Sequence, residues 1–210
     1  MAVYVALLRA VNVTGTALQM TELKAICEGI GFTDVQTYIQ SGNVLFRSGD
    51  KEASVAENLD EALGKKFGKK PGVMLRTAKE LDEIAAKAPF PKAKPNFLLV
   101  HFLPTKAPAD ALDGMVAPDG EEAAVAGREI YVHYPNGSGR SKLKLPALKA
   151  GTSRNLNTVR KLAEMARALG EAGRRQPAAA HASSSICQES PHLRSDGTQA
   201  SRKLRALTTG

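Results

Sequence analysis

Residues 35–47 read Val-Gln-Thr-Tyr-Ile-Gln-Ser-Gly-Asn-Val-Leu-Phe-Arg, and this stretch decides the fold. Residues 35–39 alternate between apolar and polar, as a half-buried strand does, and residues 44–47 form a second short strand. Residues 41–43 predict a hairpin turn between them, because glycine accepts a positive φ and its serine and asparagine neighbours tolerate turn geometry. Four hydrogen-bonding side chains gather around this turn: Tyr38, Gln40, Ser41 and Asn43.

The first seventy-six residues extend this hairpin into a β-α-β-β-α-β pattern. Residues 3–8 are apolar at both odd and even positions, which is typical of a central strand. Residues 73–76 form the closing strand. Two stretches with helical spacing lie between the strands, with apolar stripes at Met20, Leu23, Ile26, Cys27 and Ile30, and at Val55, Leu59, Leu63 and Phe67. This element order is that of a ferredoxin-like plait.

The strand order predicts where a site would lie. A right-handed crossover makes the first two strands parallel, and the plait places the third strand between them, antiparallel to both. The end of the first strand then lies beside the hairpin turn. Arg9 and Asn12 are therefore expected to join Gln40, Ser41 and Asn43 in one polar rim.

A second unit is expected after a connector at residues 77–96. The connector opens with Thr77 and Glu80, spaced as in a capping box, ahead of a helix. The β-α-β-β order then starts again, less regularly, with a strand at 97–103, a short helix at 109–115, and two strands at 122–126 and 129–134. Residues 151–155 precede a C-terminal amphipathic helix, for which Ser153 or Asn155 would serve as N-cap.

The predicted fold class is α+β, with two ferredoxin-like α/β-plait units, the second irregular, followed by a C-terminal helix. The segments are a first unit at 1–76, the connector at 77–96, a second unit with its helix at 97–170, and a tail at 171–210. The tail is expected to be disordered, because its composition lacks the apolar periodicity needed to offset its ordering entropy.

The formal charge of +8 is distributed unevenly. Residues 130–163 hold seven basic side chains and no acidic one: Arg140, Lys142, Lys144, Lys149, Arg154, Arg160 and Lys161. Such a stretch attracts phosphorylated metabolites or nucleic acid, although a solvated basic face is an equally good explanation.

Two places in this basic stretch are candidates for anion binding. Ser141 and Lys142 follow a glycine-rich loop that could present backbone N–H groups, although the loop lacks the spacing of a Walker A motif. Arg154 and Asn155 lie at the expected start of the last helix, where the helix dipole favours an anion.

Several classes of protein are not indicated. The four histidines are scattered without a second ligand at usable spacing, so no metal or cofactor is proposed. Cys27 and Cys187 do not suggest a disulfide framework, since one falls on a helical stripe and the other in the tail. No apolar run approaches the ~20 residues that cross a bilayer, so a cytoplasmic protein is expected.

Four separated motifs resemble a bacterial family of unknown function, DUF1697. They lie at residues 7–13, 37–43, 141–142 and 153–159, in the family's order, and the resemblance extends from about residue 3 to residue 169. The first motif has Ala10 where the family usually has glycine, and the last has Leu156 where it usually has tryptophan. The resemblance implies a pair of α/β-plait units and supplies no activity.

Three classes of function stay open. The first is binding of a small anionic or phosphorylated ligand at the rim, with help from Lys142 or Arg154. The second is nucleic-acid binding through the basic stretch, although the aromatic and basic strand motif of RNA-binding plaits is absent. The third is an enzyme of unknown reaction, for which no base is placed to activate Ser41. Catalytic residues and oligomeric state are not indicated.

Overall fold

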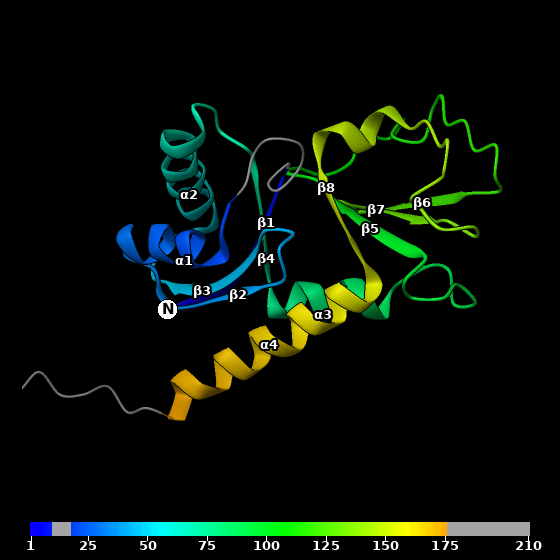
Figure 1. Ribbon diagram of the computed structural model, residues 1–210. Helices are drawn as coiled ribbons and strands as arrows, with labels where there is room; N and C mark the ends of the chain where they lie inside the picture. The colour runs from blue at the N-terminus through cyan, green and yellow to red at the C-terminus, as the bar shows by residue number, and fades with distance from the viewer. Residues whose placement is uncertain (10–17, 176–210) are drawn as a thin grey trace, which may run out of the picture. The chain divides into compact units, whose positions relative to one another are not determined.

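The computed structural model describes residues 1–9 and 18–175, which lie within a unit spanning Met1–Pro177. Four α-helices and eight strands follow one another in this part of the chain (Figure 1). The strands are β1 (Ala2–Leu8), β2 (Thr33–Tyr38), β3 (Asn43–Ser48), β4 (Val73–Thr77), β5 (Leu98–Phe102), β6 (Glu122–Ala126), β7 (Glu129–His133) and β8 (Thr152–Asn155). The helices are α1 (Met20–Gly29), α2 (Glu52–Phe67), α3 (Ala78–Ala86) and α4 (Leu156–Arg175). None of these helices is long and apolar enough to span a membrane.

The first four strands form one antiparallel sheet in the order β2-β3-β1-β4. Strand β3 lies between β1 and β2 and is antiparallel to both, as the sequence predicts. The central strand β1 is buried along most of its length, which explains why its residues are apolar at both parities.

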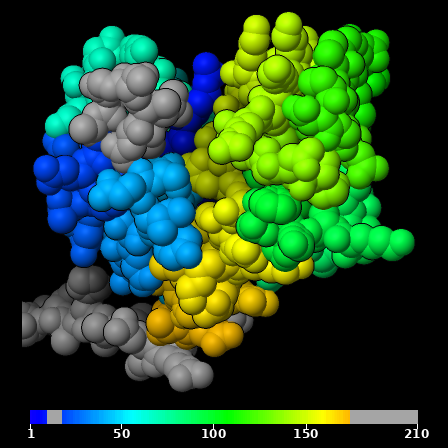
Figure 2. Space-filling view, turned by 45° about the vertical axis from the view of Figure 1, so that its right-hand side comes forward, coloured from blue at the N-terminus to red at the C-terminus, as the bar shows by residue number. Residues whose placement is uncertain are grey.

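Each face of this sheet is covered by a pair of helices. Helices α1 and α2 pack on one face, where the predicted stripes of both helices meet Tyr4, Ala6 and Leu8. Helices α3 and α4 cover the other face, in a core that also contains Val100, Phe102 and Tyr131 of the second sheet. Figure 2 shows the yellow atoms of α4 between light-blue atoms of the β2–β3 region and green atoms from the following half of the chain. One apolar core is therefore shared by both sheets.

The second sheet repeats the strand order of the first. Its strands lie in the order β6-β7-β5-β8, and every neighbouring pair is antiparallel. Its connections differ, because successive turns join β5 to β6 and a 3₁₀ helix (Pro146–Ala150) precedes β8. The chain is thus an α+β protein with two four-stranded antiparallel sheets.

The second half of the chain differs from the sequence prediction at residues 109–115, which are not helical. The N–H groups of Ala111, Asp113 and Met115 bond to carbonyls three residues back, and Gly114 has a φ of 69°, so consecutive turns replace the helix. Residues 152–155, which no predicted strand covers, form strand β8 by pairing with β5. Helix α4 ends at Arg175, and the remainder of the predicted tail lies outside the described residues.

The helix termini follow local chemistry. Thr77 and Glu80 form the predicted capping box at α3. Asn155 caps α4 by accepting a hydrogen bond from the N–H of Thr158 at 2.9 Å. Gly68 ends α2 in the left-handed conformation, with a φ of 70°. The N-cap of α2 is Lys51, whose side chain makes no capping hydrogen bond.

We predict that Gly151→Ala destabilises the protein by several kcal/mol. A Cβ at this position would lie 2.2 Å from the carbonyl oxygen of Phe102, so β8 would have to move away from β5. Gly139→Ala is the matched control, because nothing lies within 4 Å of its added Cβ. Urea unfolding of both variants checks this, and equal midpoints would contradict the packing described here.

Candidate functional site

The end of β1 and the β2–β3 turn lie side by side. The N–H of Leu8 donates to the carbonyl of Gly42 at 2.9 Å, and Leu7 is paired with Asn43 across the two strands. This adjacency, which the sequence predicts from the strand order, is confirmed. It brings segments more than thirty residues apart into one place, which we call the rim: Arg9, Gln40, Ser41, Asn43 and Arg154.

Asn43 organises the turn from within. Its side chain is fully buried and donates to the Tyr38 carbonyl at 3.0 Å and to the Ser41 hydroxyl at 2.9 Å. Ile39 has a φ of 50°, which a β-branched residue rarely adopts, and its side chain is exposed. The bonds made by Asn43 close the turn on either side of Ile39 and hold this unfavourable backbone in place.

Arg154 reaches the rim from β8 of the second sheet. Its Nε donates to Asn43 Oδ1 at 2.5 Å, and its Nη2 donates to the carbonyls of Ser41, Gly42 and Leu8 at 2.6, 3.3 and 3.2 Å. Its Nη1 donates to Thr152 Oγ1 and to the Ser153 carbonyl. Every nitrogen of the guanidinium is therefore occupied by acceptors of the protein itself.

The charge of Arg154 has no acidic partner among the described residues. All six of its acceptors are neutral oxygens, and its side chain is only 7% exposed. Burial lowers its pKa to about 10, so the guanidinium stays charged at neutral pH. A buried positive charge without a neighbouring carboxylate makes the surroundings of the turn electropositive.

The structure brings some of the predicted site residues together and leaves others apart. Gln40 is exposed and Ser41 half-buried at the turn, and Arg9 is exposed beside Gly72, whose carbonyl accepts from its N–H at 3.0 Å. Tyr38 is half-buried against the shared core, and Asn12 lies outside the described residues. Asn155 is occupied in capping α4. Ser141 instead lines a pocket of about 210 Å³ among the turns around residues 119–121 and 134–141, where its hydroxyl donates to Glu121 and accepts from the N–H of Leu143. Lys142 is exposed beside it.

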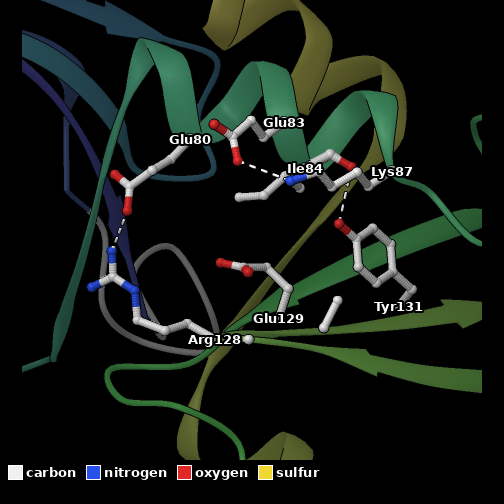
Figure 3. A pocket seen from close by; sticks show the side chains of 9 residues that line it. Glu80, Glu83, Ile84, Lys87, Arg128, Glu129 and Tyr131 are labelled. Carbon is white, nitrogen blue, oxygen red and sulfur yellow. Dashed lines mark hydrogen bonds and ion pairs between the residues drawn. The ribbon is translucent and has the colours of Figure 1, made fainter.

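A larger pocket, of about 360 Å³, lies between α3 and the β6–β7 hairpin (Figure 3). Glu80 and Glu83 of α3, together with Lys87 directly after the helix, line it opposite Arg128 and Glu129 of the hairpin. Its charges neutralise one another: Arg128 bonds to Glu80 and to Glu52 at 2.7 Å each, and Lys87 bonds to Glu83 at 3.0 Å. A ligand would have to displace these pairs.

A second buried arginine lies beside this pocket. Arg76 of β4 donates to Glu129 Oε1 at 2.7 Å and to the carbonyls of Leu103 and Arg128 at 3.1 and 3.3 Å. Burial lowers the pKa of Arg76, and Glu129 opposes this change. Sequence reasoning missed Arg76. The signal that could have found it is a charged residue placed directly after the apolar residues of β4.

Hydrogen bonding outweighs burial in setting the pKa of two half-buried residues of this network, Glu80 and Arg128. Burial raises the pKa of Glu80, but the backbone and side chain of Thr77, together with Arg128, lower it further, so the net direction is down. Burial lowers the pKa of Arg128, but Glu52 and Glu80 raise it by more. Both groups are therefore held in their charged forms. The described residues contain no cluster of three or more metal-ligating side chains.

Comparison with known proteins identifies the family. The model of "Protein of unknown function (DUF1697)" matches residues 1–131. The chain belongs to the DUF1697 family. No curated protein matches this DUF1697 chain.

A solved structure shares the fold of this DUF1697 protein. The conserved bacterial protein SP0830 from Streptococcus pneumoniae is 21% identical, with a TM-score of 0.67, over 80% of this chain and 99% of that one. At this identity the likeness shows the fold alone.

We predict that Arg154→Lys destabilises this DUF1697 protein by about 3 kcal/mol, since an ammonium has three donors and cannot reach six acceptors around a planar guanidinium. Arg160→Lys is the control, because Arg160 is exposed on α4. Urea unfolding measures both. A cost for Arg154→Lys no greater than that of the control would mean that the buried network contributes nothing to stability.

We also predict that His101 makes stability depend on pH. Its ring is 8% exposed, its Nε2 has no hydrogen-bond partner among the described residues, and burial lowers its pKa to about 4. The unfolded chain therefore binds a proton between pH 6.5 and 4 that the folded chain does not. The free energy of unfolding falls across this window as pH decreases, by about 3 kcal/mol in total, and His101 adds no further change below it.

Urea unfolding at pH 7 and pH 4.5 compares wild type with His101→Gln. The variant should lose less stability than wild type on acidification, because it lacks the titrating group. Identical losses in the two proteins would rule out His101 as the source.

Proposed function

We propose that this protein binds a small anion of the phosphate class at the rim. The observation that carries the proposal is the buried, uncompensated charge of Arg154 beneath the β2–β3 turn. In contrast, Arg76 and Arg128 both pair with carboxylates, so their fields are largely cancelled nearby. The rim is where a positive charge is left without an acidic neighbour.

Side-chain donors at the rim would contact the anion directly. The Arg9 side chain is free of any ion pair among the described residues, and Ser41 and Gln40 stand on the turn above Arg154. Arg154 itself would act through its field, since its donors are used within the protein. Asn43 and Arg154 hold the turn in one conformation, so binding would cost little further ordering of the backbone.

The nucleic-acid alternative has less support. It depends on the basic stretch from Arg140 to Lys161 acting as one surface. Arg154 is buried within the protein, and Lys161 bonds to Glu164 at 2.9 Å. These two side chains are therefore not available to contact phosphates as free cations.

We further propose that the first sheet, with α1 and α2 on one face, is a ferredoxin-like plait. Its strand order and antiparallel pairing support this interpretation. The second sheet would be a variant of the same plan, in which turns replace the crossover helices.

The proposal predicts that phosphate compounds stabilise the protein against heat. Thermal-shift measurements with sodium phosphate, pyrophosphate and nucleoside monophosphates should find at least one compound that raises Tm by several degrees at a concentration near 100 Kd. Arg9→Ala should abolish the rise, whereas Arg160→Ala removes the same charge from the exposed face of α4 and should leave it intact.

Two outcomes contradict the proposal: no compound raises Tm, or Arg9→Ala and Arg160→Ala reduce the rise equally. Binding to single-stranded RNA that weakens steeply with salt, together with a silent set of small phosphates, would favour the nucleic-acid alternative instead.

A further inference from the structure

Strand β6 is an edge strand that lacks the usual protection against pairing with another strand. Edge strands are commonly shortened, bulged, covered or charged. At the other edges, β2 contains a register shift near Asp34, β4 carries Arg76, whose side chain bonds to the carbonyl of Arg128, and β8 has only four residues. Strand β6 pairs regularly with β7 over five residues, contains no proline or bulge, and has a single charged residue, Glu122, at its start.

The hairpin turn after β6 determines which backbone N–H and C=O groups of β6 point away from β7. Residues 127–128 form a two-residue hairpin loop, so Ala126 and Glu129 close the ladder as a hydrogen-bonded pair. Because such pairs alternate along antiparallel strands, Ala124 and Glu122 also bond to β7, whereas Ala123 and Val125 direct their N–H and C=O groups away from it. Within the described part of the chain, these outward groups have no backbone partner outside the sheet.

We propose that β6 pairs with β6 of a second copy of this chain, antiparallel, about a two-fold axis at Ala124. In this register Ala123 of one copy lies opposite Val125 of the other, and both pairs are of the hydrogen-bonded type. The four outward groups of each copy are then all satisfied, by four hydrogen bonds between the copies. The two sheets become one continuous eight-stranded sheet.

The side chains fit this pairing. Ala124 meets its symmetry mate at the non-hydrogen-bonded position, where Cα atoms approach to about 4.5 Å and a methyl group is readily accommodated. Glu122 lies opposite Ala126, so no like charges face each other across the axis. Val125, which is 39% exposed, gains apolar neighbours. Any extended peptide could pair with the same outward groups, but only a second copy places Ala124 opposite itself, and the charge variants at this position test for that arrangement.

Association has to overcome the repulsion between two chains of formal charge +8. The experiment therefore uses the full chain at 0.15 M salt, where the Debye length is about 8 Å. Sedimentation equilibrium over a range of concentrations should show wild type as a monomer–dimer mixture that shifts toward dimer as concentration rises.

Introducing a charge at the two-fold axis tests the register of the pairing. Ala124→Lys and Ala124→Glu each place two like charges together across the axis, and each should weaken the dimer at least about tenfold. An equimolar mixture of the two variants pairs opposite charges and should restore dimers. Ala124 keeps its bonds to β7 in both variants, so the fold can be verified by circular dichroism.

A second pair of variants covers the case in which residue 124 does not tolerate a charge. Val125→Pro removes one outward N–H and should weaken the dimer, whereas Val125→Thr keeps that N–H and should not. A wild-type chain that stays monomeric, dimers unaffected by Ala124→Lys and Val125→Pro, or a variant mixture that stays monomeric would each overturn the proposal.

Discussion

The buried guanidinium of Arg154 is the interaction on which the arrangement at the rim depends. It extends from the last strand of the second sheet and satisfies carbonyls at the end of β1 and in the β2–β3 turn. Carbonyl groups at the end of a sheet need partners when they are buried, and a planar group with five donors can serve several of them at once. One side chain therefore closes a gap in the hydrogen bonding of the first sheet with a residue of the second.

A second arginine makes the reciprocal connection. Arg76 extends from the first sheet to carbonyls at Leu103 and Arg128 in the second. The two connections differ in their charge balance, because Arg76 has Glu129 as a partner and Arg154 has neutral acceptors. The charge of Arg76 is compensated by Glu129, whereas the charge of Arg154 is not compensated and leaves a positive field at the surface. This difference is why the rim, rather than the larger pocket beside α3, is the better candidate for binding an anion.

The two sheets share a strand order but differ in how their faces and edges are covered. Helices α1 and α2 cover one face of the first sheet, and α3 and α4 lie in the core common to both. The second sheet packs its other face against turns and the short 3₁₀ helix, with Leu103, Leu145 and Ile130 in that core. Turns cover less surface than helices do, and the edge strand β6 is left open beside them.

Much of the first unit could be predicted from sequence, because its signals are local. Alternation at residues 35–39, helical stripes and the Thr77–Glu80 box depend on neighbours a few positions away. The adjacency of β1 and the turn also followed, since strand order constrains geometry. Strand β8 could not be predicted, because Thr-Ser-Arg-Asn has no apolar alternation and becomes a strand only by pairing with β5.

The sequence by itself thus determined the elements of the first sheet and the place where its polar turn meets the end of β1. Only the tertiary structure decided that Arg154 is buried there rather than free to bind, because four of its six acceptors come from residues more than 110 positions away.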